Sequence, residues 1–382
     1  MIGFNLTPEQ NALQEKARRF AREVILPAAA VHDREGTFPL DIMRRAHAEG
    51  YLTPLVPRQY GGGGWGILDT CLLSEELAWG DMGIFVSIFV STLALHPVIR
   101  FGTEDQKERF LRPFCSRYTL GSYCLSEPTA GSDPASLQTT ATPDGNGYLL
   151  NGTKMWITNG GYADLFVVFA TTDRQKKHGG IIALIVPGSS PGIRRGGPID
   201  KMGQRASNTT AVTFRDVRVG RENLLGGERE GFKKAMAALD ITRPMIGAGA
   251  VGLSRSALEL AARYAQKRVQ FGVPISHHQA IQFLLADMAI GIDAARLLVW
   301  RAASLADEGQ RNSTEAAAAK AFAADVAMKV TTDAVQVYGA MGYTKYHPVE
   351  KLMRDAKVIQ IYEGSAQIMR RIIARSILGR VP

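Results

Sequence analysis

Apolar residues recur at intervals of three and four positions through most of the first third of the chain. This spacing predicts helices over residues 7–30, 41–49, 67–79, 82–99 and 103–116. Two of these segments begin with a Thr that is followed three residues later by a Gln, at Thr7 and Thr103, a pairing that caps helix N-termini. We therefore expect residues 1–118 to form an N-terminal all-α domain.

The pattern changes after residue 118 to short apolar, β-branched runs separated by Gly, Pro, Asp and Asn. The runs cover residues 167–170, 181–186 and 211–214, and the Asp-Gly-Asn-Gly sequence at 144–147 is typical of a hairpin turn. Because no helical pattern lies between these strands, we predict a small antiparallel β-barrel or sandwich over residues 119–228.

The helical period returns after residue 227. Three long helices are marked by apolar positions at helical spacing, namely Phe232, Met236, Leu239 and Ile246, then Leu284, Met288, Ile292, Ala295 and Val299, then Phe322, Val326, Val330 and Val337. Together with the segment after Ser365, they predict a four-helix bundle over residues 229–382. The expected fold class is thus α+β and multidomain.

The composition is that of an ordinary globular protein, with 46% apolar and 21% charged residues. The formal net charge is +9, but the basic residues are dispersed along the chain. We therefore expect neither a nucleic acid nor a membrane as partner. The net charge is compatible with attraction to phosphate-bearing small molecules, with attraction to an acidic protein, and with a basic surface that has no specific partner.

Cysteine usage and apolar runs narrow the class further. Cys71, Cys115 and Cys124 lack metal-ligand spacing, so neither a disulfide framework nor a metal site is expected. We expect that no uninterrupted apolar stretch is long enough to span a bilayer. Residues 1–6 do not have the pattern of a targeting peptide, which favours a cytoplasmic protein.

A glycine-rich segment at residues 61–66 formally matches GxGxxG. Its flanks are helical, and the preceding Pro54 and Pro57 are unsuited to a central strand, which argues against a dinucleotide-binding site. We interpret the segment as a flexible connection.

The most distinctive candidate chemistry lies in a short interruption between two helical segments. Tyr362, Glu363 and Gly364 break the pattern, and Ser365 is a suitable N-cap for the next helix. A carboxylate on an apolar, glycine-hinged connection is poorly solvated, and this raises its pKa toward a value useful for a general base. For a lone Glu, a solvated loop position is the usual interpretation.

Three motifs decide between these interpretations, because they resemble those of the acyl-CoA dehydrogenases. They are SEPTAGSD at 126–133, KMWITNG at 154–160 and RDAKVIQIYEG at 354–364. The resemblance extends from about residue 4 to residue 378 and comes close to the short- and medium-chain members. It implies the three-domain fold predicted above, FAD as cofactor and a homotetramer.

The resemblance also implies a role for each candidate residue. Glu363 would remove the α-proton of an acyl-CoA thioester while a hydride leaves the β-carbon for flavin N5, giving a trans-2-enoyl-CoA. The residues implied to bind FAD are Ser126, Ser132, Trp156, Thr158, Arg268, Gln270, Phe271, Gln279, Gln336, Gly339, Ser365 and Gln367, of which Arg268, Gln270, Phe271 and Gln279 would reach the FAD of a neighbouring subunit. The residues implied to bind substrate are Ser132, Asp240, Arg243, Tyr362, Gly364, Phe85 and Phe89.

Several of these residues have ordinary structural interpretations as well. Asp240 and Arg243 have the i, i+3 spacing of a surface ion pair, and Trp156 suits the core of a strand. Phe85 and Phe89, one helical turn apart, would shorten the acyl cavity and favour short or short-branched chains, or they are core residues.

At two positions, this chain differs from all or some members of the family that it resembles. Ala340 replaces the second Gly of a Gln-x-x-Gly-Gly motif that approaches the cofactor, and the lost glycine crowds that approach. Thr242 occupies the position at which isovaleryl-type members carry their catalytic Glu, and this strengthens the assignment of Glu363.

The family reaction implies an electron-transferring flavoprotein as the acceptor of the electrons. Three alternatives stay open on the same fold: an acyl-CoA oxidase, an enoyl-CoA reductase, and a non-catalytic scaffold that binds acyl-CoA.

Overall fold

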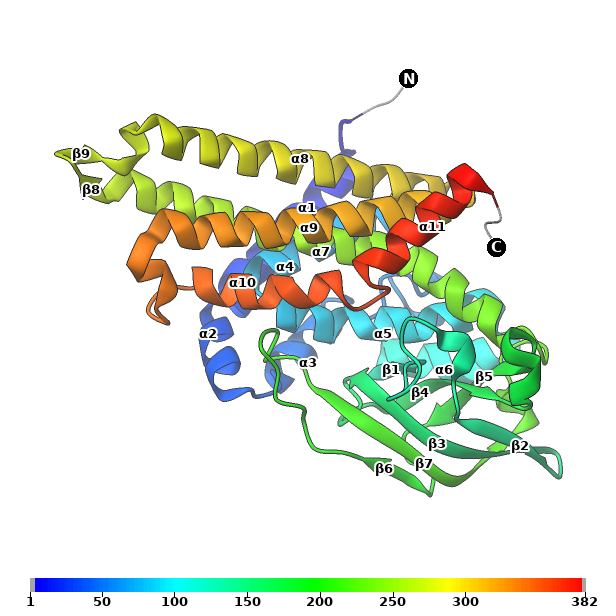
Figure 1. Ribbon diagram of the computed structural model, residues 1–382. Coiled ribbons are helices and arrows are strands. Elements are labelled where there is room, and N and C mark those ends of the chain that lie inside the picture. Colours follow the sequence, from blue (N-terminus) through cyan, green and yellow to red (C-terminus); the bar gives the residue numbers. More distant parts are fainter. Residues whose placement is uncertain (1–3, 380–382) are drawn as a thin grey trace.

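The computed structural model describes residues 4–379. Figure 1 shows a long helical bundle along one side, a curled sheet on the other, and the N-terminal helices behind the bundle. Residues 1–3 and 380–382 lie outside the described residues. Residues 1–3 belong to the predicted N-terminal domain and to the N-terminus that lacks a targeting pattern. Residues 380–382 belong to the predicted bundle.

The first part of the chain is helical, as predicted. It contains α1 (Pro8–Phe20), the π-helix η1 (Ala21–Ile25), α2 (Leu26–Glu35), α3 (Leu40–Ala48), the 3-10 turn η2 (Arg58–Tyr60), α4 (Ile67–Gly80), α5 (Met82–Phe101) and α6 (Glu104–Ser116). Both predicted caps are confirmed, since the Thr7 and Thr103 side chains accept hydrogen bonds from the backbone N–H groups of Gln10 and Gln106. The π-helix carries the first helical segment beyond residue 30, to Glu35.

Helix α5 corrects one expectation. An apolar window within its 20 residues has a mean hydropathy of 2.0, so the helix is long and apolar enough to cross a membrane, and the expectation that no such stretch exists is wrong. However, 94% of that window is buried inside the protein. It packs against α4, α6 and α7 and against strand β1 (Gly121–Cys124), so its apolar surface is that of a core helix.

The glycine-rich segment is not the flexible connection that was predicted. The backbone N–H of Gly63 donates to the Thr53 carbonyl at 3.2 Å, and that of Gly64 donates to the Val56 carbonyl at 2.9 Å. A Cβ atom at Gly62 would lie 2.2 Å from the Val56 carbonyl oxygen. The glycines are therefore needed for close backbone packing, and the segment is a tight turn.

The middle of the chain forms a seven-stranded curled sheet. Its strands are β1, β2 (Thr140–Asp144), β3 (Gly147–Thr158), β4 (Leu165–Thr171), β5 (Ile181–Pro187), β6 (Ile193–Arg195) and β7 (Thr209–Gly220), in the order β1-β4-β2-β3-β7-β6, with β5 paired to β4. The predicted hairpin is confirmed, because Asp144 pairs with Gly147. The sheet is mixed rather than purely antiparallel, since β4 runs parallel to both β1 and β2. Short 3-10 turns follow β1, β4 and β7: η3 (Pro134–Ser136), η4 (Arg174–Gly180) and η5 (Arg221–Asn223).

The last part of the chain is the predicted bundle with one addition. Its elements are α7 (Gly231–Lys267), a hairpin of β8 (Val269–Gln270) and β9 (Val273–Pro274), η6 (Ile275–His277), α8 (Gln279–Asp307), α9 (Ser313–Tyr338), η7 (Gly339–Tyr343), α10 (Val349–Lys357), η8 (Val358–Gln360) and α11 (Ala366–Leu378). The prediction gave the fourth place to the segment after Ser365 alone. Instead, both α10 and α11 pack on α9, end to end in Figure 1.

Buried ion pairs join the N-terminal helices to the bundle. The side chains of Glu75 and Glu76 on α4 are 3% and 0% exposed. Arg255 of α7 binds both carboxylates, Arg296 of α8 binds Glu75 at 2.9 Å, and Arg18 of α1 binds Glu76 at 2.9 Å. These contacts fix α4 relative to α1, α7 and α8.

Candidate active site

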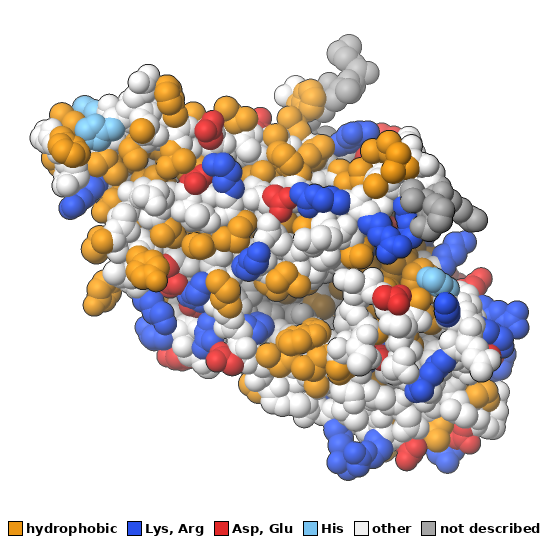
Figure 2. Space-filling model, viewed as in Figure 1, with side chains coloured by type: hydrophobic (Ala, Val, Ile, Leu, Met, Phe, Trp, Pro, Cys, Tyr) orange, Lys and Arg blue, Asp and Glu red, His pale blue; other side chains and the backbone are white. Residues whose placement is uncertain are grey.

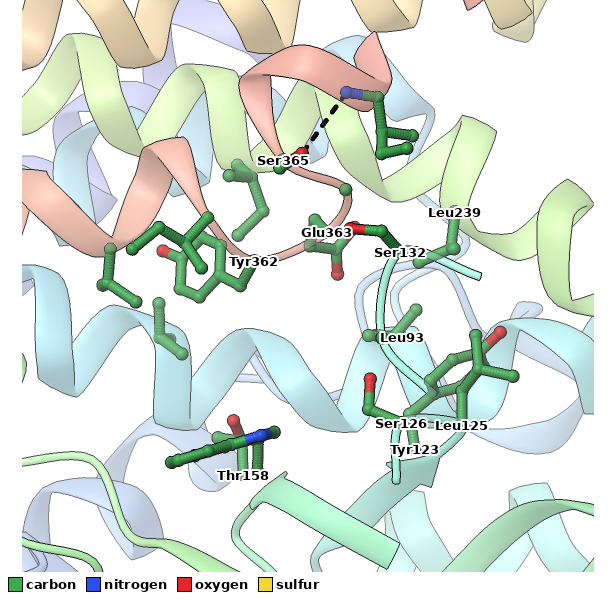
Figure 3. A pocket seen from close by; sticks show the side chains of 18 of the residues that line it. Leu93, Tyr123, Leu125, Ser126, Ser132, Thr158, Leu239, Tyr362, Glu363 and Ser365 are labelled. Carbon is green, nitrogen blue, oxygen red and sulfur yellow. Dashed lines mark hydrogen bonds between the residues drawn. The ribbon is translucent and has the colours of Figure 1, made fainter. Parts of the chain in front are cut away.

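A cavity of about 1200 Å³ lies between the sheet, α5, α7 and the loop that precedes α11. Figure 2 shows the molecular surface hollowed at this place, between the bundle and the sheet. In Figure 3, Tyr362 and Glu363 come from the loop on one side of the cavity, while Ser126, in the loop after β1, and Thr158, at the end of β3, lie on the other. The long α5 supplies much of the apolar lining, through Val86, Phe89, Val90 and Leu93. The cavity thus combines an apolar interior with polar groups on two opposed walls.

Glu363 is held at the cavity wall by two consecutive residues of α7. The Thr242 hydroxyl donates a hydrogen bond to Glu363 Oε2 at 3.0 Å, and Arg243 Nε donates to the Glu363 carbonyl at 3.1 Å. Burial raises the pKa of Glu363 to about 6, although Arg243, the Thr242 hydrogen bond and Lys320 oppose the rise. A carboxylate with such a pKa is ionised near neutral pH and can act as a general base toward a C–H group whose developing negative charge is stabilised elsewhere.

The backbone of this loop is strained. Glu363 has a φ of 56°, in the left-handed region that disfavours residues with a Cβ atom, and Gly364 follows with a φ of 95°. The predicted cap is confirmed, because Ser365 Oγ accepts a hydrogen bond from the Ile368 N–H at 3.3 Å, drawn as the dashed line in Figure 3. The cap fixes where α11 begins and so limits the loop that carries Glu363.

The opposite wall presents an indole and two hydroxyls. Trp156 is 57% exposed, and it lines the cavity with Thr158 and Ser126. The pairing of β3 with β7 is irregular here, because a bulge shifts the register between Lys154 and Ile157, and Trp156 has a φ of 64°. Both side chains nevertheless reach the cavity. The alternative of a core Trp is wrong.

A buried ion pair fixes this wall from behind. Lys154 Nζ donates to Glu127 Oε1 at 2.7 Å and to the Leu125 carbonyl at 3.1 Å, and its side chain is 0% exposed. Glu127 in turn accepts hydrogen bonds from the backbone N–H groups of Gln138 and Thr139. The segment that carries Ser126 is therefore tied to β3 by charge as well as by backbone contacts.

Asp240 and Arg243 form the expected ion pair, at 2.7 Å, but it is not on the surface. The Arg243 side chain is 4% exposed and lines the cavity. Asp240 also accepts a hydrogen bond from Ser313 at 2.5 Å. Its role is to hold the Arg243 guanidinium, which in turn holds Glu363.

The two phenylalanines occupy different layers. Phe89 lines the cavity, whereas Phe85 lies behind it with the ring centroids 5.7 Å apart. Gly249 of α7 makes room for the Phe85 ring, since a Cβ atom there would lie 2.6 Å from it. Only Phe89 limits the cavity directly, and Phe85 supports it.

Several cationic side chains line the cavity. Lys201, Arg354, Lys357, Arg371 and Arg375 all line it. Arg371 and Arg375, one turn apart on α11, are exposed to solvent. The exposed charges of these two arginines suit the phosphate groups of a large ligand. Among residues 4–379, no group of three or more His, Cys, Asp or Glu side chains is placed to hold a metal ion.

The structure brings part of the predicted set together and leaves the rest apart. The cavity is lined by Ser126, Ser132, Trp156, Thr158, Arg243, Phe89, Tyr362, Glu363, Gly364 and Ser365. The predicted residues that do not line it are Phe85, Asp240, Arg268, Gln270, Phe271, Gln279, Gln336, Gly339 and Gln367. Four of these lie on or beside the β8–β9 hairpin, which projects from the far end of the bundle, and Phe271 is 95% exposed.

Three residues of the site were missed or only partly anticipated. The sequence patterns indicate Thr242 only as a position that lacks a Glu, and they do not indicate Lys320 or Gln204. Lys320 Nζ donates to the Gly364 carbonyl at 2.6 Å, and the Gln204 amide donates to the Tyr362 hydroxyl at 3.3 Å. The one available signal for Lys320 was a charged residue within an alanine-rich helix.

Comparisons with known proteins agree on one family along the whole chain. Three family models match: the acyl-CoA dehydrogenase N-terminal domain over residues 7–117, the middle domain over residues 122–217 and the C-terminal domain over residues 229–378. A relative from Caenorhabditis briggsae, named as a probable medium-chain specific mitochondrial acyl-CoA dehydrogenase, is 42% identical over 100% of this chain and 93% of its own length. An acyl-CoA dehydrogenase of Bacillus subtilis is 43% identical, over 98% of this chain and 99% of its own.

Solved structures match along nearly the whole chain as well. Butyryl-CoA dehydrogenase from Megasphaera elsdenii matches with a TM-score of 0.96 and 41% identity, over 99% of this chain and 100% of that one. A chain in a study of the electron transferring flavoprotein of Acidaminococcus fermentans matches with a TM-score of 0.97 and 43% identity, with 99% and 100% covered. The FAD complex of PigA matches with a TM-score of 0.94 and 28% identity, with 98% and 99% covered.

Proposed function

The chain belongs to the acyl-CoA dehydrogenase family and is an oxidoreductase that uses FAD, and we propose that Glu363 is the base that removes the α-proton of its acyl-CoA substrate. The proposed product is a trans-2-enoyl-CoA. The observation that carries this proposal is the position of a poorly solvated carboxylate on the cavity wall opposite an indole and two hydroxyls.

The wall opposite Glu363 fits a flavin. Within the described residues, neither the Ser126 nor the Thr158 hydroxyl has a hydrogen-bonding partner, and the indole of Trp156 is exposed beside them. These three side chains would hold the flavin ring, and Ser132 would contact a phosphate. Bound FAD supplies the acceptor for the hydride that leaves the β-carbon.

The loop supplies both groups that deprotonation requires. The Glu363 carboxylate accepts the α-proton, and its backbone N–H, which has no hydrogen-bonding partner among residues 4–379, would donate to the thioester carbonyl. A donor at that oxygen stabilises the negative charge that develops when the proton leaves. Arg243 and Thr242 keep the carboxylate at the wall, while the apolar α5 side chains exclude water.

We propose that the acyl chain points toward Phe89 and that the enzyme prefers short, short-branched or medium chains. The bulk of Phe89, supported by Phe85, limits the depth of the apolar end. The CoA phosphates would bind near Arg371 and Arg375. The similar enzyme from Megasphaera elsdenii is named for butyryl-CoA, a short-chain substrate, which agrees with this preference.

We further propose a homotetramer that passes its electrons to an electron-transferring flavoprotein. Phe283, Ile290 and Leu297 form an exposed apolar stripe with seven-residue spacing along α8. The hairpin residues implied to reach FAD lie outside the cavity of their own chain, so a second copy would have to supply them. Both observations support association between copies. The proposed electron acceptor is supported by the similar chain from the study of the electron transferring flavoprotein of Acidaminococcus fermentans.

The deciding experiment is anaerobic mixing of the purified yellow protein with saturated acyl-CoAs, from butyryl and isobutyryl to hexadecanoyl. We expect the flavin absorbance to bleach, most strongly with one of the shorter chains. Glu363→Gln should keep its FAD but lose the bleaching. Bleaching by Glu363→Gln at a near-normal rate would contradict the assignment of the base.

The same sample separates the alternatives. An oxygen electrode reveals an acyl-CoA oxidase by rapid oxygen consumption, and reduction of an enoyl-CoA by the reduced protein reveals a reductase. A flavin that stays oxidised with every thioester would favour the reductase or the non-catalytic scaffold.

A further inference from the structure

Lys320 is a buried lysine to which the proposed reaction gives no role. It lies on α9 among buried alanines, and the residue is 0% exposed. Its ammonium donates to the Gly364 carbonyl at 2.6 Å and has no salt-bridge partner among the described residues. Because burying a charge without an adjacent opposite charge is costly, this position requires a compensating interaction.

The first compensating interaction is the hydrogen bond to the loop. Two cations from different helices bind the successive carbonyls of the strained loop: Arg243 binds that of Glu363, and Lys320 binds that of Gly364. Since Glu363 has a φ of 56° and Gly364 has a φ of 95°, the two contacts hold the loop in a conformation it would otherwise leave. They thereby fix where both the carboxylate and the backbone N–H of Glu363 point.

The second compensation is electrostatic. Burial lowers the pKa of Lys320 to about 7, and the negative charge of Glu363 opposes this effect. Conversely, Lys320 is among the groups that oppose the raised pKa of Glu363. Each charge thus stabilises the other across the loop.

The charged and titratable groups around this pair come from several elements. They are Arg243 with its partner Asp240 on α7, Asp325 on α9 with its partner Arg370 on α11, Tyr123 on β1 and Tyr362 in the loop. Arg243 opposes the charge on Lys320 and supports that on Glu363. Lys320 and Arg243 therefore act on the carboxylate in the same sense.

We propose that Lys320 is a positioning residue that holds the Glu363–Gly364 turn and stabilises the ionised carboxylate of Glu363. This role rests on the proposed function of Glu363 as the base. Lys320 is not among the residues that line the cavity. It acts through the loop.

The test compares the pH dependence of kcat/KM for butyryl-CoA, or for the acyl-CoA that bleaches the flavin best, in three variants of the FAD-loaded protein. Lys320→Met removes the charge and the donor, Lys320→Gln keeps a donor, and Lys329→Met changes an exposed lysine of the same helix whose side chain is 63% exposed. Exchange of the substrate α-hydrogen with D₂O, followed by mass spectrometry, measures proton removal separately. Thermal unfolding and FAD content show whether each variant is folded.

We expect the acid limb of kcat/KM and of α-hydrogen exchange to move up by about one pH unit in both Lys320 variants, because an opposite charge has been removed from the carboxylate. Lys320→Gln should recover part of kcat without restoring the limb, and Lys329→Met should leave both unchanged. The proposal would be overturned if the Lys320 variants had a reduced kcat but an unchanged acid limb of the pH profile. It would also be overturned if Lys320→Gln had the acid limb of the unaltered protein.

Two further comparisons keep the test decisive. If Lys320→Met does not fold, Lys320→Gln against Lys329→Met decides alone. If Glu363→Gln still exchanges the α-hydrogen, the assignment of the base fails. If Glu363→Gln is inactive while the limb of the Lys320 variants stays in place, only the role of Lys320 fails.

Discussion

At the scale of single residues, the site depends on one carboxylate held by a hydroxyl and two cations. Thr242, Arg243 and Lys320 reach Glu363 and Gly364 from two helices that are far apart in the sequence. No periodicity links residues at such separations, so the sequence motifs identified Glu363, Arg243 and Gly364 but neither the contacts among them nor Lys320. Resemblance identified the residue, and only the fold shows what controls its pKa.

The raised pKa of Glu363 predicts the pH dependence of the reaction. A base must be ionised to accept a proton, so kcat/KM should fall as the pH is lowered through about 6. A pH–rate profile between pH 5 and 8 measures the midpoint. A midpoint near 4.5, the ordinary value for Glu, would mean that the cavity does not desolvate the carboxylate as described.

Thr242→Val tests the hydroxyl at nearly constant volume. Loss of the hydrogen bond to Glu363 Oε2 removes a stabilising contact of the ionised form, so the acid limb should move up by about one pH unit. Thr242→Ser, which keeps the hydroxyl, is the control and should behave like the unaltered protein. An unmoved limb in Thr242→Val would show that the hydrogen bond does not stabilise the ionised carboxylate.

At the scale of elements, local signals were predictable and long-range ones were not. The Thr caps and the Asp144–Gly147 hairpin depend on neighbours within a few residues, and they are confirmed. The bulge at Trp156 depends on pairing with β7, and the parallel pairing of β1 with β4 depends on sheet order, neither of which periodicity specifies. A helical segment before Tyr362 was predicted, but the packing of α10 on α9 beside α11 depends on contacts that are distant in the sequence.

The buried pair behind β3 gives a prediction for that element. Lys154→Met would leave the Glu127 carboxylate buried without its cation, and we expect a loss of about 3–5 kcal/mol in the free energy of unfolding, with weaker retention of FAD. Denaturant unfolding and flavin absorbance after dialysis measure both. Adding Glu127→Gln removes the orphaned charge, so the double variant should be more stable than Lys154→Met. Equal stability would contradict this explanation.

At the scale of the whole molecule, the ion pairs of α4 make the contact between the helical layers sensitive to acid. Burial raises the pKa of Glu76, but hydrogen bonds from Arg255 and Arg18 outweigh it, and the net pKa lies below the ordinary value. Such a carboxylate stabilises the fold above pH 4.5 and loses this contribution as the pH falls further. The network therefore stabilises the protein near neutral pH.

Glu76→Gln makes this dependence measurable. We expect the variant to unfold at a lower temperature than the unaltered protein at pH 7, because two arginines lose their partner, and the difference should stay constant down to pH 4.5 and shrink as the pH is lowered further. Thermal unfolding of both proteins across this range provides the comparison. A difference that is constant with pH would show that the lost contact is not electrostatic.

Association between copies is the second prediction at this scale. Phe283→Asp combined with Ile290→Asp places charges on the apolar stripe of α8 and should shift a tetramer to smaller species with loss of FAD. Light scattering after gel filtration measures the mass. Phe4→Asp, at an exposed aromatic residue outside the bundle, is the control. An unaltered protein that is monomeric and fully loaded with FAD would contradict the proposed homotetramer.

The burial of α5 also has a consequence for how the chain is made. Residues 82–101 leave the ribosome long before α7, which begins at Gly231 and covers part of their surface. At about 5–20 residues per second, the delay is on the order of ten seconds, during which the nascent chain displays a helix as apolar as a membrane span. A product that ends before Gly231 leaves the surface that α7 covers permanently exposed, so incomplete chains should be the aggregation-prone species in cells.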